Sequence, residues 1–216
     1  MKFSLAVFDM DGTILNTLED LHDSLNVTLK KFGYPTRTLE EVRRFVGNGI
    51  FKLIERAAPA GCSMEQVEEV YQEFVPYYRA HCAEKTRPYD GIVKLLSDLK
   101  ENGLKLAVVS NKADAAVLDL CVQYFDGLFD MAVGERTGMA KKPAPDMVKL
   151  VLSSLQISKE EAVYIGDSEV DVATAVNSGL HLCAVDWGFR DVDVLRANGA
   201  EYIFSDTESL KAYLLE

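Results

Sequence analysis

The sequence predicts an α/β protein with a parallel sheet core and an inserted all-helical cap domain. From residue 88 on, short apolar runs alternate with helical patterns, which is typical of strand–helix–strand units. The apolar runs are nearly continuous, as expected for strands buried on both faces. Residues 16–83 instead show helical spacing without a convincing strand. We therefore expect a core of residues 1–15 and 84–216 and a helical cap of residues 16–83.

Six apolar runs are expected to form the strands of the core. They cover residues 3–8, 104–109, 129–133, 162–166, 180–185 and 201–204. The helices expected between and after them cover residues 91–102, 113–124, 145–155, 169–178 and 206–215. Gly103 and Gly179 stand where two of these helices should end, since glycine favours the backbone conformation that follows a helix.

The predicted cap begins with leucines at helical spacing, and Gly33 marks the end of that helix. Further helices are expected over residues 38–45, after Gly49, and over residues 63–83. Ser63 and Gln66 have the spacing of a capping box at the start of the last of these helices.

Composition limits the possible partners. The 216-residue chain is 48% hydrophobic and 26% charged, as in ordinary globular proteins, and its net charge is −11. Nucleic acids and anionic membranes bind basic surfaces, so we expect neither as a partner. The chain shows no signal-peptide pattern and no apolar run near the ~20 residues of a membrane span. With four cysteines and no C-x-x-C pair, these features predict a cytoplasmic protein with reduced thiols.

Polar side chains gather where three of the predicted strands end. The groups are Asp9 with Asp11, Ser110 with Asn111, and Asp167 with Asp171. Carboxyl ends of parallel strands share one edge of a sheet, which is where such folds bind ligands. One aspartate after a strand is usually a cap or turn residue. Three polar groups in one short chain instead indicate a site.

Simpler explanations cover only part of this pattern. A turn before Gly12 needs one aspartate, not both Asp9 and Asp11. A calcium loop needs its glycine at the sixth position, and Gly12 is fourth counted from Asp9. Helix capping accounts for Asp167 or its neighbour, but not for Asp171 as well. A zinc site is a weak alternative, because the adjacent His81 and Cys82 diverge on a helix.

The charges predict a metal ion. Four carboxylates at one edge repel one another, and Lys142 in the "AKKPAPD" loop supplies only one compensating charge. A hard divalent cation with oxygen ligands would supply the rest, and Mg²⁺ is usual beside phosphate. A carboxylate held beside a metal and a lysine can attack phosphorus and form an aspartyl phosphate. Asp11 could then act as general acid and base, while Ser110 and Asn111 donate hydrogen bonds to the phosphoryl group.

Four segments resemble, in order, the motifs of the haloacid dehalogenase superfamily of phosphohydrolases. They are "FDMDGT", "VVSNK", the lysine of "KKPAPD", and "IGDSEVD". The resemblance implies a Rossmann-like core, with Asp9 as the nucleophile and Asp11 as the general acid and base. It also implies that Ser110 and Lys142 hold the phosphate. Asn16 departs from the family pattern, which often has an acid there.

The same resemblance implies how a metal is bound. Mg²⁺ would be held by Asp9, by the backbone carbonyl of Asp11 and by Asp167. Asp171 would support the water shell of the ion.

The helical insertion resembles the type-one cap of this family. "FVGNGI", residues 45–50, resembles the cap loop of phosphoglycolate phosphatases, so Gly47 and Asn48 are candidate specificity residues. A plain turn between helices is an equally good interpretation. "DWGFR", residues 186–190, resembles a segment of the same subgroup. Arg190 could reach an anionic substrate tail, or could simply be an exposed arginine.

These observations favour a Mg²⁺-dependent phosphatase that acts on a small phosphorylated metabolite, with 2-phosphoglycolate as the first candidate. A phosphomutase similar to β-phosphoglucomutase and an inorganic pyrophosphatase are alternatives within the superfamily. A non-catalytic module that binds a phospholigand is a third possibility. The retained acidic cluster and Lys142 argue against it, because the cluster is electrostatically costly. The sequence does not distinguish a monomer from a weak dimer.

Overall fold

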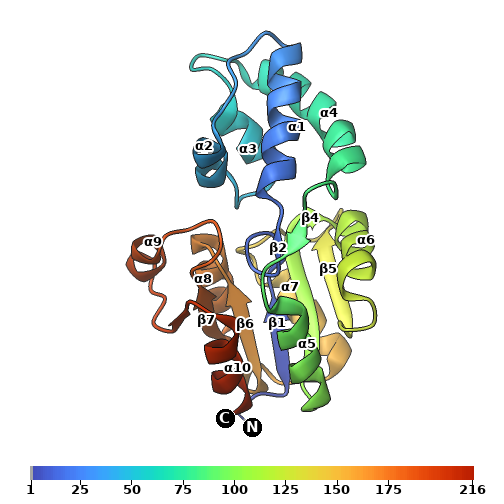
Figure 1. The fold of residues 1–216 in the computed structure, drawn as a ribbon, viewed down its shortest axis with the longest axis vertical. Helices are drawn as coiled ribbons and strands as arrows, with labels where there is room; N and C mark the ends of the chain where they lie inside the picture. The colour runs from blue at the N-terminus through green and yellow to red at the C-terminus, as the bar shows by residue number, and fades with distance from the viewer. Residues whose placement is uncertain (1) are drawn as a thin grey trace. The chain divides into compact units, whose positions relative to one another are not determined.

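The computed structural model describes residues 2–216, and its core is a six-stranded parallel sheet (Figure 1). The strands are β1 (Leu5–Phe8), β4 (Lys105–Ala113), β5 (Met131–Glu135), β6 (Ala162–Gly166), β7 (His181–Val185) and β8 (Ile203–Phe204). Their order across the sheet is β5-β4-β1-β6-β7-β8, and every neighbouring pair is parallel. The predicted α/β fold with a parallel sheet is therefore confirmed.

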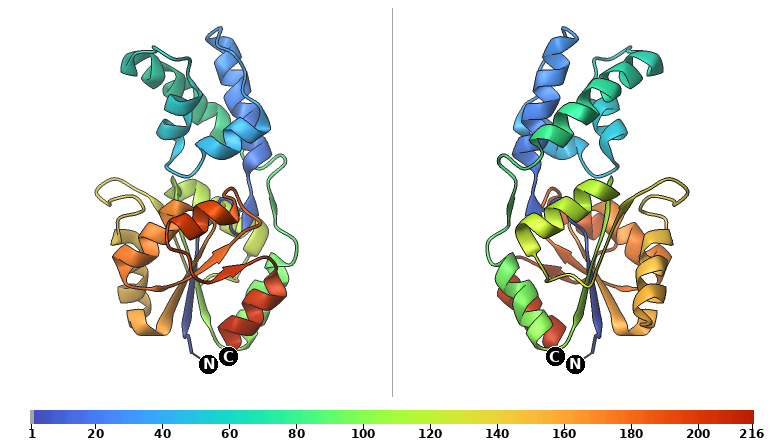
Figure 2. Two further views of the ribbon diagram at one scale, coloured as in Figure 1. Left: turned by 90° about the vertical axis from the view of Figure 1, so that its left-hand side faces the viewer. Right: turned by 90° about the vertical axis from the view of Figure 1, so that its right-hand side faces the viewer.

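Helices cover both faces of this sheet. They are α5 (Ile92–Glu101), α6 (Asp114–Phe125), α7 (Asp146–Leu155), α8 (Glu169–Ser178), α9 (Val192–Ala197) and α10 (Thr207–Leu215). Figure 2 shows α5 and α10 against one face and α7 and α8 against the other. The buried side chains of β1 and β6 pack with those of α7 in a common apolar cluster. The central strands β1 and β6 are thus buried along their whole length, as their apolar runs predict, whereas the edge strands β5 and β8 are partly half-buried.

A helical segment follows β1. It contains α1 (Leu18–Lys31), α2 (Leu39–Phe45), α3 (Ile50–Ala57) and α4 (Met64–His81). Ser63 and Gln66 form the predicted capping box at the start of α4. Two short strands, β2 (Leu15–Asn16) and β3 (Arg87–Pro88), pair where the chain enters and leaves this segment.

The chain divides into two compact units, Met1–Leu15 with Pro88–Glu216 and Asn16–Arg87. Residues 84–87, which we expect in the core, group with the helical unit. The reason is the buried carboxylate of Asp20, which accepts hydrogen bonds from the backbone N–H groups of Lys85 at 2.9 Å and Thr86 at 2.8 Å. These bonds tie the returning chain to α1.

Strand β4 is longer than the predicted strand 104–109. It continues through Ser110, Asn111 and Lys112 to Ala113, with a shift in register against β5 after Val109. The residues of the second motif therefore belong to a strand and not to a loop. This difference determines where their side chains lie.

Two findings bear on the expected surroundings of the protein. No helix within residues 2–216 has both the length and the apolar character needed to cross a bilayer. All four cysteines are free, with Cys121 and Cys183 buried and the other two half-buried.

Candidate active site

The candidate site lies at the carboxyl ends of three neighbouring strands. In the sheet register Phe8 of β1 lies beside Val108 of β4 and Ile165 of β6. The next residue, Asp9, donates its backbone N–H to the carbonyl of Ile165 at 2.8 Å. The polar residues that follow these strands are therefore brought to one edge by the sheet itself.

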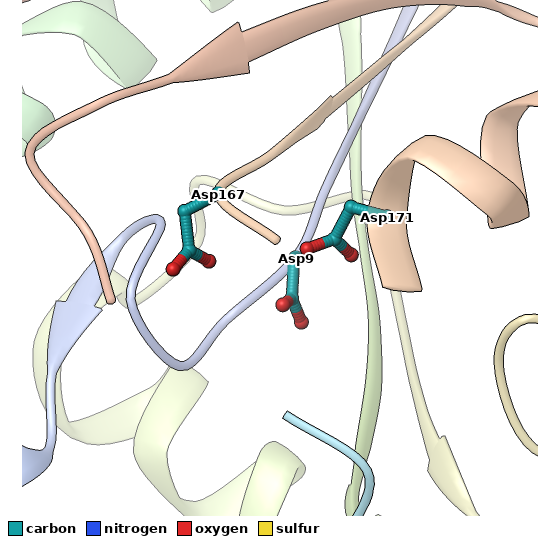
Figure 3. A group of neighbouring side chains, drawn as sticks. All are labelled: Asp9, Asp167 and Asp171. Atoms are coloured by element: carbon teal, nitrogen blue, oxygen red, sulfur yellow. The ribbon is translucent and has the colours of Figure 1, made fainter. Parts of the chain in front are cut away.

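Three carboxylates meet at this edge (Figure 3). One oxygen from each of Asp9, Asp167 and Asp171 lies within 4.8 Å of the other two. Asp171 is fully buried, Asp167 is 1% exposed and Asp9 is 8% exposed. Burial, together with the charge of Asp171, raises the pKa of Asp9 well above its ordinary value. A cation is needed here if all three groups are to be ionised together.

Lys142 supplies part of the positive charge that the three carboxylates require. Its Nζ lies 2.8 Å from Asp9 Oδ1 and 2.8 Å from Asp171 Oδ1. The hydroxyl of Tyr164 lies 3.1 Å from the same ammonium and also donates to Asp171 at 3.1 Å. Burial opposes the charge on Lys142, but the carboxylates of Asp171 and Asp9 outweigh it and hold its pKa well above the usual value. The lysine therefore stays protonated and bridges two of the three acids.

Asp171 also caps helix α8, which corrects one of the expectations above. Its Oδ2 accepts hydrogen bonds from the backbone N–H of Ser168 at 3.1 Å and from the Ser168 hydroxyl at 2.6 Å. Ser168 Oγ in turn belongs to the capping box of α8. The expectation that capping leaves Asp171 unexplained is therefore wrong. One carboxylate oxygen of Asp171 caps the N-terminus of α8, and the other forms an ion pair with Lys142.

Asp167 is held from two sides. Thr13 Oγ1 donates to its Oδ1 at 3.0 Å, and the backbone N–H of Phe189 donates to its Oδ2 at 2.7 Å. Gly12 and Gly188 approach the carboxylate so closely that a Cβ on either would overlap it. Burial is the main reason that the pKa of Asp167 is raised to about 7, and the Asp171 charge adds to it.

The "DWGFR" segment thus has a role that the sequence did not reveal. Gly188 and Phe189 lie against Asp167, and Trp187 Nε1 donates to the carbonyl of Thr13 at 3.0 Å. The segment joins the first motif to the fourth. Arg190 forms an ion pair with Glu169 at 2.7 Å, and its reach toward a substrate remains a prediction.

Asn111 and Ser110 form hydrogen bonds with the backbone near the site. The side-chain amide of Asn111 accepts from the backbone N–H of Lys142 at 2.8 Å and donates to its carbonyl at 3.1 Å. Buried Ser110 accepts the N–H of Lys112 at its hydroxyl, at 3.2 Å. Asn111 therefore anchors the loop that carries Lys142, while contact of Asn111 or Ser110 with phosphate remains a prediction.

Lys112 is a residue of the site that sequence reasoning did not identify. Its Nζ lies 3.0 Å from Asp11 Oδ1, and its side chain is only 5% exposed, against 19% for that of Asp11. The lysine stands in the quoted "VVSNK" motif. Because we expected the strand to end at residue 109, nothing indicated which way the Lys112 side chain points. The site therefore contains two ammonium groups and not one.

The site fits a divalent cation. The clustered donors are carboxylate oxygens, which are the ligands of hard cations. Burial raises the pKa of Asp9 and of Asp167, and the charge of Asp171 adds to both shifts, so a bound cation would favour the ionised carboxylates. Both oxygens of Asp167 and both oxygens of Asp171 accept hydrogen bonds from protein groups, and Oδ1 of Asp171 also lies against the Lys142 ammonium. The division into metal ligands and a supporting Asp171 remains a prediction.

The two candidate specificity residues of the helical unit, Gly47 and Asn48, lie in the turn before α3. Asn48 Oδ1 accepts a hydrogen bond from Arg56 at 2.6 Å, and Gly47 has a φ of +123°. The turn before α3 is therefore fixed within its own unit. Substrate contact by Gly47 or Asn48 remains a prediction.

Comparison with known proteins agrees with this geometry. The family model described as "Haloacid dehalogenase-like hydrolase" matches residues 6–185. A phosphoglycolate phosphatase of Caulobacter vibrioides is 34% identical over 92% of this chain and 86% of its own. One from Psychrobacter arcticus is 30% identical over 100% of this chain and 97% of its own.

A crystal structure from Lactobacillus delbrueckii subsp. bulgaricus, of a protein predicted to be a phosphoglycolate phosphatase, has the same fold. It is 39% identical, covers 99% of each chain and superposes with a TM-score of 0.93. The helical insertion after β1 is thus shared with a close structural relative. This chain belongs to the haloacid dehalogenase-like hydrolases, and within them it is an enzyme of the phosphoglycolate phosphatase-like kind.

Proposed function

We propose that this enzyme is a Mg²⁺-dependent phosphatase of small phosphomonoesters that works through an aspartyl phosphate on Asp9. 2-Phosphoglycolate is the first candidate substrate, since curated relatives of similar length carry that activity in their names. The observation that carries the proposal is the Asp9 carboxylate, buried at a strand end with Lys142 at 2.8 Å and Asp167 close by. A carboxylate in such a setting can act as a nucleophile.

The residues of the chain divide the reaction between them. Lys142 and the backbone N–H of Met10 both contact Asp9 Oδ1, at 2.8 and 2.6 Å, and so fix the orientation of the nucleophile. Attack by Asp9 forms an oxygen–phosphorus bond and breaks the ester bond, while Asp11 donates a proton to the leaving oxygen. Bound Mg²⁺ would supply positive charge to the phosphoryl oxygens.

The second half of the reaction restores the enzyme. Asp11, having lost its proton, takes one from a water molecule as that water attacks the aspartyl phosphate. The bond between Asp9 and phosphorus breaks, and inorganic phosphate leaves. Asp11 suits both steps because its side chain is the more exposed of the two motif-one aspartates, at 19% against 11%.

A phosphate-release assay with 2-phosphoglycolate tests the proposal. Wild type should release phosphate with Mg²⁺ and lose this activity with a chelator. Asp9→Asn should lower kcat at least about 10⁴-fold while the circular dichroism spectrum stays unchanged. Exposed Asp90→Asn is the matched control and should retain full activity. Substantial hydrolysis by Asp9→Asn would place the nucleophile elsewhere.

The alternatives give different products in the same assay. A phosphomutase would move the phosphoryl group of a sugar phosphate and release little free phosphate. A pyrophosphatase would prefer pyrophosphate to any ester, and a binding module would release nothing. A beryllium fluoride adduct on Asp9, seen in a crystal structure, would support the proposed intermediate directly.

A further inference from the structure

Lys112 is the one ammonium group of the site that the mechanism above does not use. Its side chain is 5% exposed and lies on β4 beside Ser110. Burial of a charged side chain is costly unless that charge interacts with others. Lys142 already serves the phosphoryl end of the site through Asp9 and Asp171. The proposed mechanism gives the second ammonium, which pairs with Asp11, no direct contact with the substrate.

Lys112 lies directly beside Asp11. Lys112 Nζ lies 3.0 Å from Asp11 Oδ1, whereas Oδ2 of that carboxylate has no hydrogen-bond partner within residues 2–216. As general acid, Asp11 must reach the ester oxygen at about 2.6–3.2 Å. The oxygen of the leaving group is therefore one carboxyl group away from the ammonium of Lys112.

A substrate with a carboxylate next to its ester oxygen would bring that carboxylate to the same place. In such a substrate one methylene separates the ester oxygen from the carboxylate carbon. An ammonium group has three N–H donors, so it can donate to more than one acceptor at a time. A substrate carboxylate at this place would be a further acceptor for Lys112 beside Asp11. Charge-assisted hydrogen bonds of this kind are stronger than neutral ones.

We propose that Lys112 is a specificity residue that binds the carboxylate of the leaving group and so selects esters of α-hydroxy acids. The inference rests on the proposed phosphatase function and deepens it. It uses only residues of the α/β core, because Asp11 and Lys112 both belong to that unit. An ester with a neutral alcohol of the same size offers Lys112 no anion, so it gains nothing from this contact.

The test compares two substrates that differ only in this group, 2-phosphoglycolate and 2-hydroxyethyl phosphate. The readout is the ratio of their kcat/KM values. Lys112→Met should lower that ratio on the order of 100-fold, the loss expected for a truncated buried charge contact. Lys112→Arg should restore much of it. Lys105→Met removes an exposed lysine of the same strand and should leave the ratio unchanged.

Two outcomes would overturn the inference. If Lys112→Met lowers kcat/KM equally for both substrates, the lysine positions Asp11 or the phosphoryl group and does not bind the substrate carboxylate. If wild type hydrolyses both substrates equally well, no carboxylate recognition exists, although the phosphatase proposal would still hold.

Binding separates this inference from the proposed function. Calorimetry on Asp9→Asn with Mg²⁺ gives dissociation constants for both compounds without turnover. Adding Lys112→Met should weaken 2-phosphoglycolate far more than 2-hydroxyethyl phosphate. If binding of 2-phosphoglycolate is weakened selectively but wild type hydrolyses neither compound, the phosphatase proposal is rejected and the carboxylate site is supported. Equal weakening of both compounds would reject the carboxylate site.

Discussion

The site has two parts that differ in burial and in connectivity. The inner cluster, defined as Asp9, Asp167, Asp171, Lys142 and Tyr164, is buried. Lys142 and Tyr164 connect Asp9 and Asp171 through hydrogen bonds and ion pairs, and Asp167 lies beside them. The outer pair, Asp11 and Lys112, joins one buried side chain to one that is 19% exposed. The inner cluster can serve what all phosphate esters have in common. In the proposed mechanism the outer pair lies beside the leaving group, which is the part in which the esters differ from one another.

The largest effect that tests this contrast is expected from Lys142→Met. The change leaves Asp9 and Asp171 buried without their cation, and breaking a buried ion pair costs about 3–5 kcal/mol. We expect kcat/KM to fall on the order of 10³-fold, equally for 2-phosphoglycolate and 2-hydroxyethyl phosphate. The melting temperature should fall as well. Exposed Lys141→Met is the control. A loss confined to one substrate would blur the division between cluster and pair.

The pH dependence of stability tests the charge of the inner cluster. Burial raises the pKa of Asp167 from 3.8 to about 7, so between these values the native state holds a proton that the unfolded chain has lost. The free energy of unfolding of the metal-free protein should therefore fall, by a few kcal/mol at most, as pH rises from about 4 to about 7. The raised pKa of Asp9 acts in the same direction.

Urea unfolding at a series of pH values measures this slope. Adding Mg²⁺ at pH 7 should restore stability, because the ion binds the ionised carboxylates of the native state. Asp167→Asn should flatten the slope. Stability that rises across this window in the metal-free protein, or an unchanged slope in Asp167→Asn, would contradict the picture of a crowded inner cluster.

Gly188→Ala should lower the affinity for Mg²⁺, with a smaller effect on activity than Lys142→Met. The added Cβ would overlap Asp167, so the carboxylate or the loop must shift. Changes next to metal ligands typically cost 10–100-fold in metal affinity, and we expect the Mg²⁺ concentration for half-maximal activity to rise about 10-fold. Gly127→Ala meets no neighbour within 4 Å, but at its φ of +70° an alanine is strained, so it controls for a loss of stability without crowding of Asp167. An equal shift in both variants would show that crowding of Asp167 is not the cause.

The smallest effect is expected from Tyr164→Phe. The hydroxyl contacts both Lys142 and Asp171, which keep their own 2.8 Å contact without it. Each buried hydrogen bond that is lost costs roughly 1 kcal/mol of stability, so the loss of both should cost about 2 kcal/mol. Activity should fall only a few-fold, again equally for both substrates. Tyr202→Phe, at an exposed tyrosine, should change neither quantity. A loss as large as that of Lys142→Met would show that the hydroxyl, and not the lysine, organises the cluster.

Most of the fold could be predicted because its signals are local. Strand 162–166 is apolar throughout. Gly179 ends helix α8 in the left-handed conformation that glycine permits. Helix α9 went unpredicted because it has six residues, too few to show a helical period. The end of β4 was missed because its last four residues, 110–113, are mostly polar. A polar run that follows apolar residues normally marks a loop.

The candidate site was predictable where residue type and strand end coincide. Asp9 and Asp167 follow strands directly, and the sheet register brings them together. The capping role of Asp171 was missed because capping boxes usually carry glutamate or glutamine at that position. Lys112 was missed because its side-chain direction depends on the extension of β4. The contacts of Gly188 and Phe189 with Asp167 depend on tertiary packing, which no local pattern encodes.

The double use of Asp171 has a consequence for how such a chain can change over evolutionary time. One carboxylate starts a helix, orients a lysine and meets a phenol, so no single replacement preserves all three connections. A descendant that replaced Asp171 would have to rebuild its helix start and find a new partner for the lysine at the same time. Asp171 should therefore persist even in relatives that have lost hydrolysis through a change at another residue, because the fold itself depends on it.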